Sequence, residues 1–241
     1  PKAMTREAKI QPSLLGLRGI KLFAGLPDDV LETVSRQCGW RRFAPDQLVI
    51  AKEATDRDVY LIVGGKVRVR VLSPGGRLTA FREVCAGEWI GDLAALDGFP
   101  RSADIVAIED SLIAMLPPDE FRTLIFKYPN VAERVILRLV GLIRDLSDRV
   151  YDLSTLGVQN RVHAEILRLA RLAGVEKNVA RIDPAPKHTD IASQVSTYRE
   201  QVTRELSALT KQGLIEREGS ALVVLDVTRL EKLVEDVRSA N

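Results

Sequence analysis

The chain has 241 residues, enough for one large domain or two ordinary ones with a substantial buried core. Apolar residues make up 46% and charged residues 28%, as in many globular proteins, and the formal net charge is only +2. With so small a net charge, any case for nucleic-acid binding must rest on where particular residues lie. No apolar run is long enough to span a membrane and no signal-peptide pattern is present, so we expect a cytoplasmic protein without a membrane partner.

Cysteine and histidine are too scattered to indicate a metal or redox centre. Cys38 and Cys85 form no C-x-x-C pair, and His163 and His188 are isolated from each other. The pattern supports neither a disulfide framework nor an iron–sulfur, haem or other metal site. Because no Ser/His/Asp, Cys/His or metal-ligand arrangement is present either, we do not expect an enzyme.

The first half of the chain predicts a short helical region followed by a sheet. Residues 1–15 are polar and unpatterned and predict a loose arm, and a helix is expected to begin at Pro27 or Asp28. From Trp40 to about Leu116, short alternating runs predict an antiparallel sheet folded into a barrel or roll. The runs are residues 48–50, 59–63, 67–71 and 112–116, and the glycine turns between them are at 64–65, 75–76 and 87.

A long helix is predicted to begin at Pro129-Asn130, with Asn130 and Glu133 in a cap-like arrangement. Apolar residues follow the alternating steps of four and three that are typical of a coiled-coil seam, although Arg149 occupies one seam position. The seam residues are Val135, Leu139, Leu142, Leu146 and Leu153, and a second apolar stripe contains Val131, Ile136, Val140 and Ile143. The helix can therefore pack both on its own sheet and on another subunit. We predict a parallel homodimer through it, and a buried intramolecular helix is the alternative.

A second domain is predicted to follow the break around Thr155-Leu156-Gly157. Its expected elements are an amphipathic helix at 162–173, a rigid Pro-Ala-Pro connector at 184–186, a helix-turn-helix, a β-hairpin or wing at 214–225 and a final helix at 228–238.

The stretch Ser196–Leu206 predicts the second helix of that helix-turn-helix. Apolar residues at helical spacing can face a small core, namely Ala192, Val195, Val202, Leu206 and Leu209. The opposite face carries Arg199, Glu200, Thr203 and Arg204 near the helix start, where a recognition helix meets base edges. Arginine fits guanine O6 and N7, and a carboxylate accepts from cytosine N4, so a G/C-containing site is expected. The alternative is a solvated helix face on which Thr197 and Glu200 form a capping box.

Residues 87–103 contain groups that suit a phosphodiester. Gly91 lets the backbone approach a ligand, and Asp92-Leu93-Ala94 can start a helical turn whose N–H groups face an anion. Arg101 and Ser102 supply a charged fork and a hydroxyl, whereas the carboxylate of Asp92 suits a sugar hydroxyl. The alternative is structural: Asp92 caps a short helix, Gly91 and Gly98 turn the chain, and Arg101 neutralises Asp92.

Taken in order, these parts resemble the cyclic-AMP receptor protein/FNR family of bacterial transcription regulators over nearly the whole chain. The resemblance rests on Gly-Glu-x-x-Gly-Asp-Leu at 87–93, Pro-Arg-Ser-Ala at 100–103, the long helix, and Arg-Glu-x-Val-x-Arg at 199–204. It implies an α+β fold with an N-terminal antiparallel β-roll that binds an effector (1–128), a dimerisation helix (129–157) and a C-terminal winged helix-turn-helix (158–241). FNR-like oxygen sensing is not expected, because the N-terminal cysteine set is missing.

The resemblance also implies roles in the roll. The backbone at Gly91, Leu93 and Ala103, with the side chains of Arg101 and Ser102, would hold a cyclic phosphate. Asp92 would take the ribose 2′-hydroxyl, at a position where members that bind cyclic AMP usually have glutamate. Leu146-Ser147 aligns with the family's adenine-sensing threonine–serine pair, with Leu146 acting in its own subunit and Ser147 toward the partner. Because the threonine is replaced, cyclic GMP is a candidate effector beside cyclic AMP.

On the DNA side, Arg199, Glu200 and Arg204 match the family's three base-reading positions. This implies double-stranded DNA with TGTGA-like half-sites as an inverted repeat one helical turn apart. Thr203, His188 and Thr189 are further candidate DNA contacts, and RNA polymerase is a candidate partner. We therefore expect a homodimeric DNA-binding regulator controlled by a cyclic nucleotide. The alternatives are the same fold with cyclic di-GMP or another small-molecule effector, or DNA binding that needs no ligand.

Overall fold

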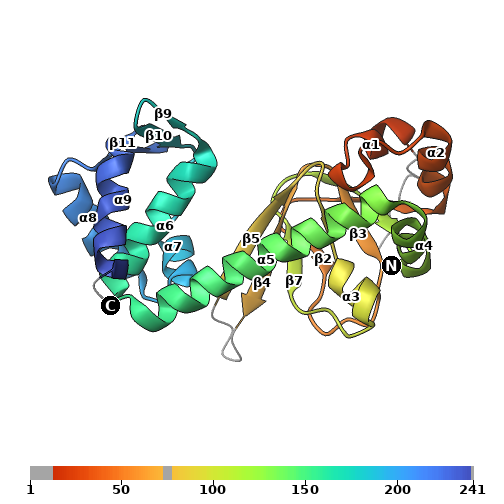
Figure 1. Cartoon of the computed structure of the whole chain (residues 1–241), viewed down its shortest axis with the longest axis horizontal. Coiled ribbons are helices and arrows are strands. Elements are labelled where there is room, and N and C mark those ends of the chain that lie inside the picture. Colours follow the sequence, from red (N-terminus) through yellow and green to blue (C-terminus); the bar gives the residue numbers. More distant parts are fainter. Residues whose placement is uncertain (1–12, 73–77, 240–241) are drawn as a thin grey trace, which may run out of the picture. The chain divides into compact units, whose positions relative to one another are not determined.

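The structure is a computed structural model that describes residues 13–72 and 78–239 of the chain. It divides into two compact units, residues 1–140 and 141–241. The boundary lies inside the long helix α5 (Pro129–Thr155), which begins and ends close to where the sequence predicts (Figure 1).

The first unit begins with three short helical segments: α1 (Leu14–Arg18), η1 (Lys21–Phe23) and α2 (Asp28–Gln37). The prediction of a loose arm over residues 1–15 is wrong for its last residues. Ser13 Oγ accepts from Gly16 N at 3.1 Å and caps α1, which begins at Leu14. Leu17 on α1 is fully buried, which holds this helix on the unit's core. The other residues of the arm, 1–12, lie outside the described residues. The predicted start of α2 is confirmed.

The predicted roll is confirmed as two four-stranded antiparallel sheets, with strand orders β1-β8-β3-β6 and β2-β7-β4-β5. The strands are β1 (Gly39–Phe43), β2 (Leu48–Ile50), β3 (Val59–Gly64), β4 (Lys66–Leu72), β5 (Leu78–Cys85), β6 (Trp89–Ile90), β7 (Asp104–Ala107) and β8 (Ser111–Leu116). The glycine turn predicted at 75–76 lies outside the described residues. The short helix α3 (Asp92–Asp97) follows β6, and α4 (Pro118–Lys127) follows β8.

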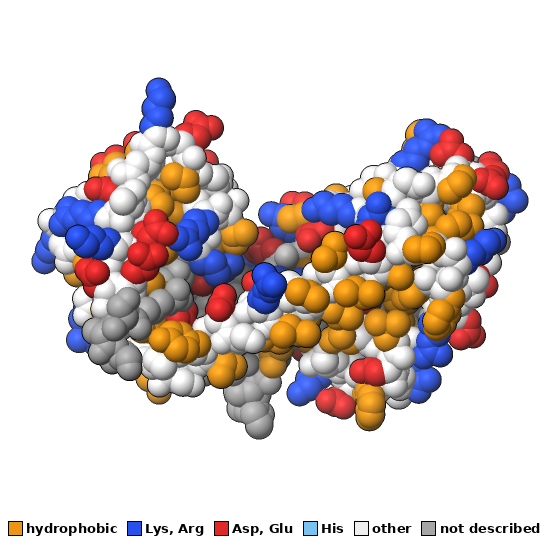
Figure 2. Space-filling model, viewed as in Figure 1, with side chains coloured by type: hydrophobic (Ala, Val, Ile, Leu, Met, Phe, Trp, Pro, Cys, Tyr) orange, Lys and Arg blue, Asp and Glu red, His pale blue; other side chains and the backbone are white. Residues whose placement is uncertain are grey.

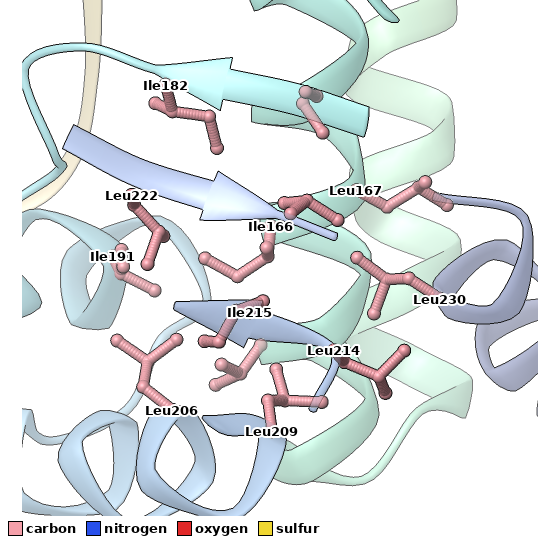
Figure 3. Close-up of a cluster of buried hydrophobic side chains, with 14 of the residues drawn as sticks. Ile166, Leu167, Ile182, Ile191, Leu206, Leu209, Leu214, Ile215, Leu222 and Leu230 are labelled. Atoms are coloured by element: carbon pink, nitrogen blue, oxygen red, sulfur yellow. The ribbon is translucent and has the colours of Figure 1, made fainter. Parts of the chain in front are cut away.

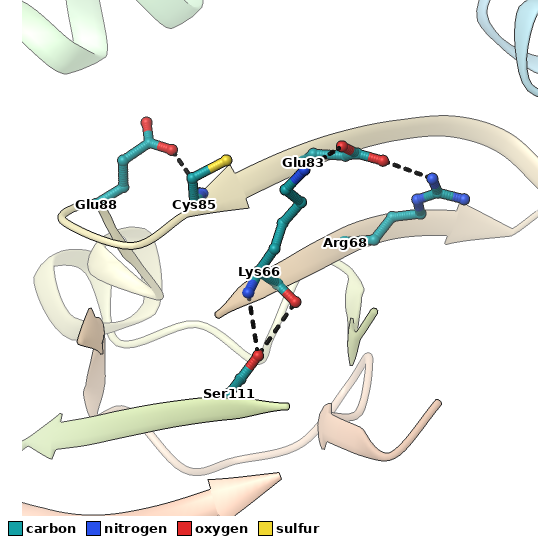
Figure 4. Close-up of polar contacts among 6 residues, drawn as sticks. All are labelled: Lys66, Arg68, Glu83, Cys85, Glu88 and Ser111. Atoms are coloured by element: carbon teal, nitrogen blue, oxygen red, sulfur yellow. Dashed lines mark hydrogen bonds and ion pairs between the residues drawn. The ribbon is translucent and has the colours of Figure 1, made fainter. Parts of the chain in front are cut away.

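Polar contacts hold β4 and β5 together within the roll (Figure 4). Arg68 and Glu83 lie directly opposite each other and form an ion pair of 2.5 Å, and Lys66 Nζ lies 3.7 Å from the same carboxylate. The Lys66 backbone N–H donates to Ser111 Oγ at 3.2 Å, which ties β4 to the start of β8. Gly65, between β3 and β4, has φ +82°, and a Cβ there would lie 2.3 Å from the Asp110 carbonyl oxygen, so the turn requires glycine.

The first turns of α5 belong to the core of the first unit. Val131 and Val135 are buried there and Leu139 packs against the same cluster. On another face of the helix, Ile136 is 59% exposed and Ile143 is 62% exposed. The interpretation of Val135 and Leu139 as part of an intersubunit seam is therefore wrong. The structure does not separate the two predicted stripes cleanly, because Val131 of the second stripe is buried in the same core, whereas Leu146 and Leu153 of the seam are 52% and 38% exposed.

The second unit is a winged helix-turn-helix, as predicted. Its helices are α6 (Val158–Ala173), α7 (His188–Gln194), α8 (Arg199–Lys211) and α9 (Val227–Ser239). Its strands are β9 (Val175–Glu176), β10 (Val179–Ile182), β11 (Ile215–Glu218) and β12 (Ala221–Val224), which form an antiparallel sheet in the order β11-β12-β10-β9. Figure 3 shows side chains from the helices and strands of this unit converging on one apolar core, among them Ile166, Leu209 and Leu222.

Within residues 13–72 and 78–239, no helix is long and apolar enough to cross a membrane. The same residues contain no group of three or more His, Cys, Asp or Glu side chains that could hold a metal ion.

His163 on α6 should make the second unit sensitive to acid. The ring is 4% exposed, and its Nε2 atom has no hydrogen-bond partner among the described residues. Burial lowers the pKa of His163 below its ordinary value, although Glu205 acts in the opposite direction. Below pH of about 6.5 the unfolded chain therefore binds a proton that the folded chain resists, so the free energy of unfolding falls as the pH falls, by at most about 1.4 kcal/mol per unit.

Urea unfolding at pH 7, 6 and 5 measures this dependence, and His163→Leu should flatten it. His188→Gln is the matched control, since His188 is less buried but also has a lowered pKa. An unchanged slope in His163→Leu would show that His163 is not responsible.

Candidate nucleotide pocket and nucleic-acid interface

Gly91 joins β6 to α3 in a conformation that only glycine adopts easily. Its φ is +86°, and a Cβ there would lie 2.6 Å from Arg101 Nη1 and 2.9 Å from the Asp58 carbonyl oxygen. Gly98 has φ +75° and ends α3, so both glycines turn the chain. Asp92 is the first residue of α3 and Gly91 is its N-cap, so the alternative in which Asp92 caps the helix is wrong.

Arg101 is almost completely enclosed by the first unit, with 3% of its surface exposed. Its Nη1 donates to the Gly91 carbonyl at 3.1 Å, and its Nη2 donates to the Asp58 carbonyl at 2.7 Å and to Asp56 Oδ2 at 2.5 Å. The guanidinium also lies over the ring of Tyr60, 5.3 Å from the centroid. Because the acidic partner of Arg101 is Asp56, the alternative in which Arg101 neutralises Asp92 is wrong.

Asp92 is also buried, at 5% exposure, and its charge is balanced from α5. Its Oδ2 accepts from Trp89 Nε1 at 3.2 Å and lies 3.2 Å from Arg138 Nε, while the Arg138 guanidinium stacks 4.5 Å from the Trp89 ring centroid. Burial lowers the pKa of Arg138, and Asp92 opposes that shift. Trp89 and Arg138 were not predicted from the sequence as site residues. The only signal was indirect: an aspartate beside an apolar run needs a cationic partner if it is buried.

The remaining predicted pocket residues fall into two groups. Leu93 and Ser102 are exposed and Ala103 is 9% exposed, and all three belong to the same local segments as Gly91 and Arg101. The structure therefore brings the 91–93 and 101–103 segments together through the contact between Arg101 and Gly91. Leu146 and Ser147 are exposed on α5, in the second unit.

The helix-turn-helix consists of α7 and α8. The five apolar residues expected to face its core are all buried, which confirms the core face of α8. The helix begins at Arg199 after Tyr198, and Ser196 lies in the turn with φ +52°. The capping box of Thr197 and Glu200 is therefore wrong, because its N-cap would lie one residue before the observed one.

The outer face of α8 presents the predicted base-reading side chains. Arg199, Glu200, Thr203 and Arg204 are all exposed, and Gln201 Oε1 accepts from Arg204 Nη2 at 2.9 Å. The opposite orientation of the core residues and these side chains follows from the helical period.

Side chains from three elements act on one another around His188 at the start of α7. His188 Nδ1 lies 2.8 Å from Thr203 Oγ1, and Thr189 beside it is exposed. Burial lowers the pKa of His188, and so do the nearby charges of Arg199 on α8 and Arg217 on β11. Arg217 was not predicted from the sequence, because its distance from α8 depends on how the wing folds back.

Two family models match this chain in the expected order. A cyclic nucleotide-binding domain matches residues 40–128, and a Crp-like helix-turn-helix domain matches residues 160–233. The chain belongs to the CRP/FNR family. Its domain structure is that of a CRP-like transcription regulator, with an effector domain and a DNA-binding domain, and neither matched family is a family of enzymes.

Individual CRP/FNR relatives match over most of their length. The CRP-like cAMP-activated global transcriptional regulator of Mycobacterium tuberculosis (strain ATCC 25618 / H37Rv) is 24% identical over 212 residues, which are 88% of this chain and 95% of the relative. The Cyclic AMP receptor protein of Thermus thermophilus is 26% identical over 219 residues, 90% of this chain and 98% of the relative. The solved structure of a CooA mutant from Carboxydothermus hydrogenoformans has a TM-score of 0.74 at 18% identity, covering 94% of this chain and 98% of that one, and shares the fold.

Proposed function

We propose that the protein is a homodimeric, sequence-specific transcription regulator whose DNA affinity is controlled by a cyclic mononucleotide bound in the β-roll. The proposal rests on the contact between Gly91 and Arg101, which holds a buried positive side chain against the backbone at the start of α3, at a position where only glycine allows so close an approach. The Mycobacterium and Thermus relatives are named for cyclic AMP, which makes it the first candidate effector. Cyclic GMP is the second, because Leu146 replaces the family's threonine.

In this proposal, the backbone at Gly91, Leu93 and Ala103, with Arg101 and Ser102, binds the cyclic phosphate. Asp92 accepts from the ribose 2′-hydroxyl, Leu146 contacts the base in its own subunit, and Ser147 contacts the base held by the partner. The Asp92–Arg138 ion pair gives α5 a direct contact with the ribose-binding carboxylate. A ribose hydroxyl that competes for Asp92 would therefore act on the proposed dimerisation helix.

The exposed apolar stripe of α5 is the proposed dimer surface. It contains Ile136, Val140, Ile143 and Val150, with Ser147 in step, at spacings of four, three, four and three. Figure 2 shows hydrophobic side chains gathered along this helix and over the neighbouring surface of the first unit. A parallel pair through this stripe would present two α8 helices to an inverted repeat of TGTGA-like half-sites. The ligand acts through its differential affinity for the two dimer states.

Calorimetric titration with cyclic AMP, cyclic GMP and cyclic di-GMP tests the effector. We expect saturable binding of a cyclic mononucleotide. Ser102→Ala should weaken it about fivefold through one lost hydrogen bond, and Arg101→Lys should weaken it by at least about tenfold because the planar fork is lost. Circular dichroism controls for folding.

The internal pairing of both Arg101 and Asp92 favours one alternative, in which the roll takes another effector or the dimer binds DNA without a ligand. If the titration shows binding of cyclic di-GMP alone, or of none of the three nucleotides, it would support that alternative and contradict cyclic mononucleotide control.

A further inference from the structure

Asp56 is paired with the guanidinium of Arg101, the group that the proposed function assigns to the ligand's phosphate. It lies in the loop between β2 and β3, where its Oδ2 accepts from Arg101 Nη2 at 2.5 Å and from the Tyr60 hydroxyl at 3.1 Å. The two charged side chains differ sharply in exposure: that of Arg101 is 3% exposed and that of Asp56 is 41% exposed. The ion pair thus joins a fixed internal cation to a carboxylate at the surface.

The hydrogen bonds of Arg101 show which of its N–H donors are already used within the protein. A guanidinium has five N–H donors, and both donors of Nη2 are used, one by the Asp58 carbonyl and one by Asp56. The buried Nε has no partner among the described residues. Since carboxylate and phosphate bind the same fork in the same geometry, Asp56 holds a position suited to a phosphate oxygen.

We infer that Asp56 is a built-in competitor of the effector's phosphate and sets the affinity of the pocket. This inference rests on the proposed function and names a residue that controls it. A cyclic phosphodiester and a carboxylate each carry one negative charge, so binding exchanges one anion for another at Arg101. The apparent affinity is then lower than the intrinsic affinity by the fraction of molecules in which Asp56 has released the arginine.

The surroundings allow this exchange without rebuilding the pocket. The carbonyls of Gly91 and Asp58 accept hydrogen bonds from Arg101 independently of Asp56. Because Gly91 has no side chain, Arg101 can lie directly against its backbone. Asp58 adds to the local negative field: burial raises the pKa of its carboxyl group, and the charge of Asp56 raises it further. Removing the Asp56 charge therefore leaves Arg101 in place and makes its environment more receptive to an anion.

Calorimetry of the full chain with cyclic AMP and cyclic GMP tests the inference in the wild type, Asp56→Asn and Glu53→Gln. Asparagine keeps the size of the side chain and an oxygen acceptor but removes the charge. Glu53 is the matched control because it belongs to the same loop and its side chain is 72% exposed, with the carboxylate 3.9 Å from Lys52 Nζ. Its backbone N–H donates to the Arg101 carbonyl at 2.9 Å, a contact that a side-chain substitution keeps. Asp56→Asn should bind about tenfold more tightly, since it removes the competing anion. Glu53→Gln should stay within about twofold, because exposed charges are screened.

A second arm uses inorganic phosphate alone, so that it does not depend on the nucleotide. The midpoint of thermal unfolding is measured against phosphate at constant ionic strength, and phosphate should stabilise Asp56→Asn more than the wild type. Phosphate stabilisation without nucleotide binding in any variant would keep the inference and contradict cyclic nucleotide control. Nucleotide binding that is unchanged or weaker in Asp56→Asn would overturn the inference and make Asp56 a positioning residue. No response in either arm would overturn both.

Discussion

Replacing Ile143 with glutamate should convert the proposed dimer into monomers at micromolar concentration. Ile143 is 62% exposed and lies in the middle of the α5 stripe, between Val140 and Val150. In a parallel coiled coil it would meet the same residue of the partner, so each dimer would have to bury two facing carboxylates. Burying charge without a partner costs several kcal/mol per group, and we expect the dimer dissociation constant to rise by at least about a hundredfold.

Analytical ultracentrifugation over a concentration series measures this change, and DNA binding should fall with it because the two half-sites would no longer be bound by one linked pair. Leu172→Glu is the matched control: Leu172 is 72% exposed and belongs to a different helix, α6. A dimer that persists in Ile143→Glu but dissociates in Leu172→Glu would place the interface elsewhere.

The register of that stripe shows where sequence periodicity stops. Two apolar stripes on one helix are equivalent in a periodicity argument, and only packing decides which faces the helix's own unit. The role of Arg149 also could not be predicted from periodicity. Its place in the predicted seam was unexplained, and in the structure its Nη2 donates to the Gln194 carbonyl at 2.8 Å within the second unit. The helix itself was predictable from local pattern, whereas the roles of its faces depended on distant partners.

The candidate pocket also contains features that could be predicted from the sequence and features that could not. The turn at Gly91 and the start of α3 follow from local residue types, and both were predicted correctly. The partners of the two charged residues were not predictable, because Asp56 is separated from Arg101 by 45 residues and Arg138 reaches Asp92 from another element. Charge pairing between distant segments leaves no periodic signal, so a sequence can indicate that a buried charge needs a partner without indicating which one.

The DNA-binding unit was the most predictable part, since its helices and wing alternate apolar and polar residues at clear periods. The contacts among side chains on its exposed face were harder to predict. The contact between His188 and Thr203 and the nearness of Arg217 arise only when α7, α8 and β11 fold together. The resemblance named His188 and Thr203 as candidate DNA contacts, but their contact with each other and the nearness of Arg217 depend on tertiary structure.

Arg204→Ala should relax DNA specificity at one base pair of each half-site. Arg204 is exposed on α8, and Gln201 orients its guanidinium by accepting from Nη2 at 2.9 Å. A bidentate contact with guanine contributes about 1–3 kcal/mol, so affinity for a TGTGA inverted repeat should fall about 5- to 150-fold per half-site. Fluorescence anisotropy against a set of duplexes, each substituted symmetrically at one position, would locate the base pair at which wild type and variant differ.

Arg217→Ala separates base reading from phosphate contact. Arg217 lies on the wing and its charge acts on His188 from outside α8, so we expect it to meet the DNA backbone. Its loss should weaken all duplexes by a similar factor and reduce the slope of log affinity against log salt by about one. Arg204→Ala should instead leave affinity for the substituted duplex unchanged, because the contact it removes is already missing there. A uniform loss in both variants would mean that α8 binds DNA without reading its sequence through Arg204.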